Sequence, residues 1–203
     1  MKNTNLLNNP IIWESYRILA NCAFGVCRKR FKFLLDHGLL NSDLSIIDIG
    51  CGIGCYSSVT RGKYFGVDLE GRYIDYARKR NCFPNCSFQS ADAASISPEG
   101  QGFDIALMVD FLHHIPDDQC LNILNNVKRI ARRHIIIFDP VAIDTRGLLG
   151  RFLAMGERCE YVRSVDRLYG LLEQCKLKIT HSVHLSFGPV DSVAIIIDLP
   201  QSP

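Results

Sequence analysis

Residues 46–54 read IIDIGCGIG, a short apolar run that meets an acid and continues into regularly spaced glycines. The two leading isoleucines are β-branched and suit a buried parallel strand, and Asp48 interrupts the apolar run. Glycine then occupies every second position, at Gly50, Gly52 and Gly54. Because glycine has no Cβ, such a loop can turn sharply and approach a ligand closely. The stretch therefore predicts a strand followed by a ligand-binding loop.

A second strand with an acid at its end follows in the sequence. The segment YFGVD, residues 64–68, places Asp68 twenty residues beyond Asp48. A strand, a glycine loop, a short helix and a second strand that ends in an acid form half of a ribose-binding site. The dinucleotide fingerprint would require glycine at position 55, which is Cys55. A ligand with a ribose and no pyrophosphate therefore fits better, and a dehydrogenase is disfavoured.

Here the chain resembles the class I S-adenosylmethionine-dependent methyltransferases, whose first motif is an acid followed by G-x-G-x-G. Asp68 stands where that family places the acid that binds both ribose hydroxyls. The segment SFQSADAASI, residues 87–96, looks like the third strand and its loop, with Asp92 as the acid that meets the adenine amino group. The segment FDIALMVDFLHHIP, residues 103–116, looks like the fourth strand and the loop that faces the methionine part. The matches follow the family order over residues 46–140.

The resemblance implies that S-adenosylmethionine is the cofactor and S-adenosylhomocysteine the product. It implies a cofactor site at the carboxyl ends of the strands, where ligands of such sheets bind. The implied cofactor-binding residues are Asp48, Gly50, Cys51, Gly52, Gly54, Asp68, Leu69, Asp92, Ala93, Val109 and Asp110.

Two adjacent histidines follow the fourth strand, and they are the best candidates for catalytic residues. Methyl transfer to a nucleophile gains most from orientation and the exclusion of water. A general base matters where the acceptor must lose a proton. His114 and His113 could supply that base. The alternative for each is that it caps the next helix or packs against it.

The periodicity predicts an α/β fold of one domain over residues 1–203, in which strands and helices alternate. By resemblance it is a Rossmann-like, doubly wound sheet of seven strands with helices on both faces, mostly parallel with an antiparallel last strand. We expect an N-terminal helical cap (1–40), a cofactor-binding half (41–140), and substrate-side helices with a closing hairpin (141–203). Strands are expected at about 44–49, 64–68, 86–89, 103–109, 134–140, 177–185 and 191–199, and helices at about 10–36 with a division at Gly25, 71–81, 118–132 with Asp117 as cap, and 144–175.

The composition is that of an ordinary globular protein, with 47% hydrophobic and 22% charged residues. A net charge of +2 gives no strong attraction to nucleic acid, and no apolar run suits a membrane span. The first ten residues lack the apolar core of a signal peptide. The nine cysteines have no paired C-x-x-C spacing, so we expect reduced, mostly buried thiols, no bound metal and a cytoplasmic location.

The acceptor site is expected between the N-terminal helix and the segment after the fifth strand. Trp13, Tyr16 and Arg17 would line it from one side, and residues 147–164 from the other, where apolar side chains would form a pocket and arginines such as Arg163 an anion-binding rim. An ordinary amphipathic helix packed on the sheet is the alternative. The cluster at residues 28–33, RKRFKF, would suit peripheral contact with an anionic membrane or nucleic acid, although four charges near a helix end more often form a solvated face.

Two functions remain open on the sequence. The first is the transfer of a methyl group from S-adenosylmethionine to an oxygen, nitrogen or carbon atom of a small or lipid-like acceptor. The second is a non-catalytic S-adenosylmethionine-binding protein or partner subunit with a methyltransferase fold. Methylation of nucleic acid is a weaker hypothesis, because no motif like N-P-P-Y follows the fourth strand. The sequence does not indicate an oligomeric state.

Overall fold

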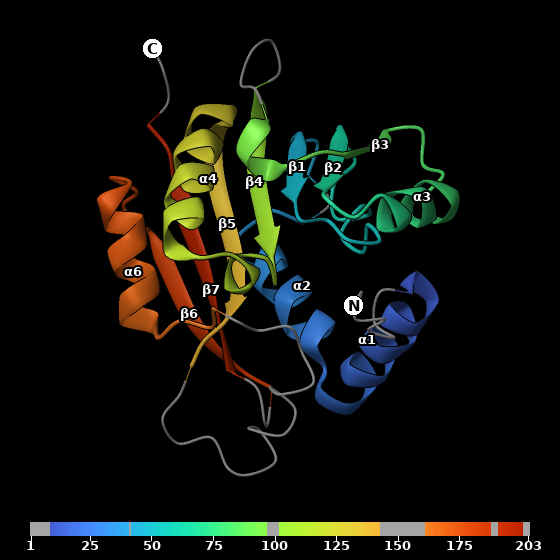
Figure 1. Ribbon diagram of the computed structural model, residues 1–203, viewed down its shortest axis with the longest axis horizontal. Helices are drawn as coiled ribbons and strands as arrows, with labels where there is room; N and C mark the ends of the chain where they lie inside the picture. Colours follow the sequence, from blue (N-terminus) through green and yellow to red (C-terminus); the bar gives the residue numbers. More distant parts are fainter. Residues whose placement is uncertain (1–8, 41, 97–101, 143–160, 188–190, 201–203) are drawn as a thin grey trace, which may run out of the picture.

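The computed structural model describes residues 9–40, 42–96, 102–142, 161–187 and 191–200. Its seven strands form a single sheet in the order β3-β2-β1-β4-β5-β7-β6 (Figure 1). The strands are β1 (Ile46–Ile49), β2 (Tyr64–Asp68), β3 (Cys86–Ser90), β4 (Phe103–Val109), β5 (Ala131–Pro140), β6 (His181–Ser186) and β7 (Asp191–Asp198). Only β7 is antiparallel to its neighbours β5 and β6. The predicted fold class is confirmed.

The helices cover both faces of this sheet. They are α1 (Pro10–Phe24), α2 (Val26–Asp36), α3 (Gly71–Arg80), α4 (Asp117–Ile130) and α6 (Val165–Gln174), with short 3-10 turns η2 (Ala93–Ser95) and η3 (Leu112–His114). The buried residues of α4 and α6 pack with one face of the sheet, and those of α2 and α3 pack with the other. Strand β1, which lies inside the sheet between β2 and β4, is buried along its whole length, as its β-branched residues predict.

The N-terminal helix divides where its sequence predicts. Gly25 adopts φ 64°, in the left-handed region that favours glycine, and separates α1 from α2. Helix α2 then packs its Phe33 ring edge-on against Phe138 of β5, with ring centroids 5.5 Å apart. Helix α1 extends beyond α2 toward α3 (Figure 1). There the Tyr76 hydroxyl of α3 donates to Glu14, which also pairs with Arg80.

One predicted helix is wrong. Residues 50–63 connect β1 to β2 through turns, although a short helix was expected after the glycine loop. The turns are closed by hydrogen bonds between residues three apart. The backbone N–H of Gly54 donates to the carbonyl of Cys51, that of Ser57 to the carbonyl of Gly54, and that of Val59 to the carbonyl of Tyr56. The left-handed glycines and the short connection leave no room for regular helical turns.

Smaller differences concern where elements begin and end. Strand β5 begins at Ala131, three residues earlier than expected, and β6 begins at His181 rather than at residue 177. Pro116, not Asp117, is the residue before α4, and Asp117 uses its carboxylate elsewhere. The expected helix over 144–175 is described only from residue 161 onward, where α6 forms. The expected turn at Gly188-Pro189 lies outside the described residues.

Candidate active site

The glycine loop has the conformation that its sequence predicts. Gly50, Gly52 and Gly54 have backbone φ angles of 73°, 53° and 74°, which residues other than glycine rarely adopt. The backbone N–H groups of Gly50 and Cys51 both donate to the Val67 carbonyl, at 2.8 and 3.0 Å, so that the loop is bound to the end of β2.

The three glycines differ in what surrounds them. A Cβ on Gly50 would lie 2.3 Å from the Phe111 ring, and a Cβ on Gly54 would lie 2.7 Å from the Phe88 ring. These two glycines therefore permit close packing inside the protein. A Cβ on Gly52 would have no described atom within 4 Å. Gly52 is thus the position where the loop turns its backbone toward open space.

Asp68, at the end of β2, binds the glycine loop directly. Its two carboxylate oxygens accept hydrogen bonds from the backbone N–H groups of Gly52, at 2.8 Å, and Glu70, at 2.9 Å. Burial raises the pKa of the Asp68 carboxyl above its usual range, against the two hydrogen bonds. The acid expected to bind a ribose therefore also fixes the loop that would support the ligand.

Asp48 lies deeper than a ligand-facing acid. Its residue is 1% exposed, and it accepts a hydrogen bond from the Tyr64 hydroxyl of β2. Burial and the neighbouring Asp48 charge raise the pKa of Tyr64, so the phenol stays protonated as a donor. Sequence analysis missed Tyr64, because its partner lies sixteen residues away on the adjacent strand.

The other implied cofactor-binding residues lie at the same edge of the sheet, where β1 to β4 end. Asp92 is exposed after β3 and accepts a hydrogen bond from Ala94 N at 2.9 Å, which begins η2 at Ala93. Leu69 is 75% exposed, and Cys51 is buried. Val109 is the last residue of β4, and Asp110 follows it. The parallel order of β3, β2, β1 and β4 brings them together.

Asp110 has a partner that the sequence did not reveal. Both of its oxygens accept from the guanidinium of Arg30, at 2.7 and 2.5 Å, across 80 residues of sequence. Arg30 was part of the cluster at residues 28–33, for which a solvated face was the more common outcome. Its neighbours Lys29 and Lys32 are exposed and bind Ser186 and Asp36, whereas Arg30 is 3% exposed. A solvated face is therefore wrong for Arg30.

The two histidines have different environments. His113 is 3% exposed, and its Nδ1 lies 3.1 Å from Oδ1 of the buried Asp139 at the end of β5. His114 is exposed, and its ring centroid lies 4.0 Å from that of His113. A positive charge on His114 would act on Asp68 to lower its pKa. The pair therefore extends from a buried carboxylate to an exposed ring at the edge of the sheet where β1 to β4 end.

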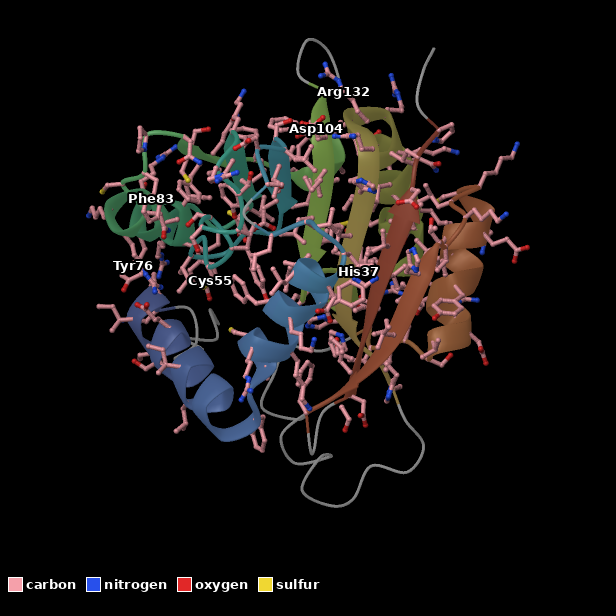
Figure 2. The ribbon with its side chains drawn as sticks, turned by 180° about the vertical axis from the view of Figure 1, so that it is seen from behind. His37, Cys55, Tyr76, Phe83, Asp104 and Arg132 are labelled. Carbon is pink, nitrogen blue, oxygen red and sulfur yellow. The ribbon has the colours of Figure 1, made fainter. Side chains whose placement is uncertain are left out.

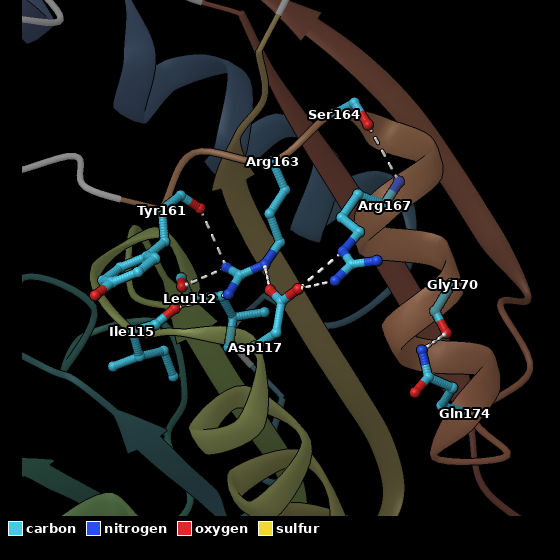
Figure 3. A network of polar contacts seen from close by, with 9 residues as sticks. All are labelled: Leu112, Ile115, Asp117, Tyr161, Arg163, Ser164, Arg167, Gly170 and Gln174. Atoms are coloured by element: carbon cyan, nitrogen blue, oxygen red, sulfur yellow. Dashed lines mark hydrogen bonds and ion pairs between the residues drawn. The ribbon is translucent and has the colours of Figure 1, made fainter.

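Arg163 holds the histidine segment in place (Figure 3). Its guanidinium donates to Asp117 and to the carbonyls of Leu112 and Ile115, each at 2.7 Å, on either side of the two histidines. The backbone N–H of Tyr161 adds a bond to the His113 carbonyl at 3.1 Å. Arg163 is 6% exposed, so the expectation that it forms an anion-binding rim is wrong. The hydrogen bonds of its guanidinium are made within the protein.

The remaining acceptor-side expectations lie outside the described residues. This applies to most of residues 147–164 and to the side chains of Trp13, Tyr16 and Arg17. The described residues do show how α1 contacts α3. Figure 2 shows Tyr76 of α3 beside the N-terminal end of α1, where its hydroxyl donates to Glu14, and Cys55 of the turn region on the same side. None of the helices among the described residues is long and apolar enough to cross a membrane.

Residues 46–134, which hold the glycine loop, the acids and both histidines, match the model of a family described as a methyltransferase domain. This segment is a methyltransferase domain. The resemblance seen in its motifs is thereby confirmed, and the domain includes four of the parallel strands in full. No curated protein matches the sequence.

Solved structures share the fold of the methyltransferase domain and of the strands that follow it. Magnesium protoporphyrin IX methyltransferase from Synechocystis PCC 6803, with bound S-adenosylhomocysteine, superposes with a TM-score of 0.70 at 16% identity, covering 98% of each chain. A S-adenosylmethionine-dependent methyltransferase from Methanosarcina mazei gives 0.67 at 20% identity, covering 83% of this chain and 98% of its own. The cyclase SpnF gives 0.67 at 12% identity, covering 86% and 81%.

Proposed function

We propose that this protein transfers a methyl group from S-adenosylmethionine to a small or lipid-like acceptor. The observation that carries the proposal is the glycine loop. Three left-handed glycines lie between two strand-end acids, inside a segment that matches a methyltransferase domain. Two solved methyltransferase structures of the same fold hold S-adenosylhomocysteine or S-adenosylmethionine. This supports the same cofactor here.

The residues present fit such a cofactor. The space next to Gly52 is open, so a ligand could approach the backbone of the loop closely there. Asp68 would accept from the ribose hydroxyls, and Asp92 from the adenine amino group. Asp110 and Val109 would lie along the methionine part. When bound, the cofactor supplies a methyl group on a sulfonium, which is its own leaving group.

The protein's own contribution is orientation, with a base where the acceptor needs one. His114 is the exposed member of the histidine pair and would accept a proton from an acceptor hydroxyl or amine. His113 is held by Asp139, whose carboxylate fixes the orientation of its ring. The contacts of Arg163 with residues 112–115 hold both rings against the sheet edge. Such fixed geometry lowers the entropic part of the barrier.

A second candidate is a protein that binds the cofactor and catalyses no methyl transfer. The observation that keeps it open is the neighbour SpnF, a cyclase with this fold. Fold alone does not decide function. The two candidates differ in turnover, because both predict binding of S-adenosylhomocysteine.

One experiment tests the proposal in two steps. Calorimetry of the purified chain with S-adenosylhomocysteine, and with NAD as control, should show micromolar affinity for the first ligand alone. Methyl-labelled S-adenosylmethionine is then incubated with pools of small metabolites and lipids, and transfer of the label should identify an acceptor. Binding without transfer in any pool would favour the second candidate. Binding of NAD instead would contradict both.

A further inference from the structure

The ion pair between Arg30 and Asp110 joins the N-terminal helices to the ligand-facing edge of the sheet. Arg30 lies on α2, and Asp110 follows the last residue of β4. The guanidinium makes two parallel hydrogen bonds to the carboxylate, at 2.7 and 2.5 Å. Two such bonds fix the orientation of both groups, which a single contact would not do.

The two partners are unequally buried. The Arg30 side chain is 4% exposed, whereas that of Asp110 is 39% exposed. Arg30 also lies over the rings of Phe138 and Phe187, with its central carbon 5.7 Å from each ring centroid. Burial alone would lower the pKa of Arg30, but the charges and hydrogen bonds of Asp110 and Tyr56 together more than offset this and raise it. The cation is therefore permanent and enclosed, and only the anion faces outward.

The backbone at Asp110 is also unusual. Its φ is 51°, and only one other described residue besides the glycines, Lys176, has a positive φ. This conformation is uncommon for a residue with a side chain, and strained backbone gathers at functional sites. Asp110 N donates to the Phe138 carbonyl at 2.8 Å, which holds the turn against β5.

These features do not have a simple explanation in stability. A buried ion pair is weak support for stability, because desolvation of the charges offsets much of their attraction. A left-handed aspartate adds a further cost. Together they hold one carboxylate in a fixed position at the end of β4, next to Phe111, whose ring packs against Gly50 of the glycine loop.

We propose that Arg30 is a positioning residue of the cofactor site, which fixes the Asp110 carboxylate so that it receives the ammonium group of the cofactor's methionine part. The inference rests on the proposed function, since it concerns the same cofactor. It assigns to α2 a role beyond covering the sheet. Arg30 itself does not touch the ligand; it acts through Asp110.

The test compares two ligands that differ in the part recognised. S-adenosylhomocysteine carries the amino-acid tail with its ammonium group, and methylthioadenosine lacks that tail. Binding of each is measured by calorimetry for the wild type, Arg30→Lys, Arg30→Met, Asp110→Asn and Lys32→Met. Asn tolerates the left-handed conformation, so Asp110→Asn removes the charge with little change of backbone. Lys32→Met is the matched control, because it breaks the exposed ion pair with Asp36 on the same helix.

We expect Asp110→Asn and Arg30→Met to weaken binding of S-adenosylhomocysteine by about tenfold or more, as loss of a charged hydrogen bond predicts. Binding of methylthioadenosine should change less than about twofold, and Lys32→Met should match the wild type for both ligands. Arg30→Lys keeps the charge but not the two-point geometry, and should give an intermediate loss with the same selectivity. If Arg30→Met does not fold, Asp110→Asn and Arg30→Lys carry the test.

Equal weakening for both ligands would overturn the inference, because a merely structural ion pair would disturb the whole site. Unchanged affinity for S-adenosylhomocysteine in Asp110→Asn would overturn it as well. Either result leaves the proposed function standing, provided that the wild type binds. A wild type that binds neither ligand would overturn the proposed function and the inference with it.

Discussion

His113 is the buried partner of Asp139: Nδ1 and Oδ1 lie 3.1 Å apart, and neither residue is more than 3% exposed. The imidazole contacts that of His114, which is exposed, with ring centroids 4.0 Å apart and ring planes tilted by 45°. Asp139 fixes the ring of His113, and His113 in turn contacts the ring of His114. In this arrangement the His114 ring could accept a proton without moving.

His114→Ala should lower the rate of methyl transfer by roughly 10²–10⁴-fold while cofactor affinity stays nearly unchanged, if the outer ring is the base. Single-turnover measurements with an identified acceptor, beside calorimetry with S-adenosylhomocysteine, separate the two effects. His134→Ala is the control, because His134 pairs with Asp198 near the start of β5. Normal single-turnover rates in both His114→Ala and His113→Ala would exclude the histidines and leave orientation as the catalytic device.

Asp68→Ala should weaken binding of S-adenosylhomocysteine by about tenfold or more, because the ligand hydroxyls and the Gly52 N–H lose a charged acceptor. Since burial raises the pKa of Asp68, affinity in the wild type should begin to fall at a higher pH on acidification than for an ordinary aspartate. Asp68→Asn should remove this acidic limb. Asp75→Ala, an exposed change on α3, should leave the calorimetric titration unaltered.

Gly52→Ala should weaken cofactor binding by about tenfold, or about 1.4 kcal/mol. The new methyl group would enter the open space that the proposal gives to the cofactor, and alanine is strained at this left-handed position. Gly170→Ala is a matched glycine on α6, where an added Cβ also meets no described atom within 4 Å. In a helix interior alanine is better than glycine by about 0.5–1 kcal/mol, so this variant should be slightly more stable and bind normally. Equal affinity in the two variants would argue against a ligand at Gly52.

Arg163→Met should destabilise the protein by roughly 3 kcal/mol or more, since it leaves a buried network of carbonyls and Asp117 without its central donor. Arg167 also binds Asp117, but its side chain is 63% exposed, so Arg167→Ala should cost no more than about 1 kcal/mol. Urea denaturation of the two variants gives the comparison. Similar midpoints would show that the Arg163 contacts do not hold the histidine segment.

All nine cysteines should be reduced thiols in the purified protein. The cysteines that the structure describes form no disulfide with one another, and burial raises the pKa of Cys120 to about 12, which disfavours its reactive thiolate. Mass spectrometry of the denatured, alkylated protein without reductant should find nine modified thiols. A mass lower by two alkyl groups for each disulfide, or a stoichiometric metal in elemental analysis, would contradict this expectation.

The sequence predicted those parts of the site that depend on local patterning. The strands, the glycine loop and the acids at strand ends follow from β-branched runs, from glycine spacing and from the rule that parallel strands end at one edge. Arg30 and Arg163 could not be found in this way, because their partners lie 80 and 46 residues away. Exposed basic residues lie nearby in the chain, Lys29 beside Arg30 and Arg167 four residues after Arg163, and only packing distinguishes an arginine that turns inward from those that do not.

The helix missing between β1 and β2 was mispredicted for a related reason. The glycine spacing indicated a loop, but it did not show that the residues between Gly54 and Tyr64 are too few for a regular helix. The segment closes instead with short-range turns around Tyr56, whose ring stacks on Phe31 of α2 at 5.6 Å.

That crossover has a consequence for motion. A helix opens cooperatively, because each hydrogen bond supports the next, whereas the turns over residues 50–63 can open one at a time. Their amide hydrogens would then exchange with solvent through small local fluctuations, while those of β1 and β4, neighbouring strands inside the sheet, would exchange only on global unfolding. The segment proposed to bind the cofactor can thus fluctuate locally while the strands that support it stay folded.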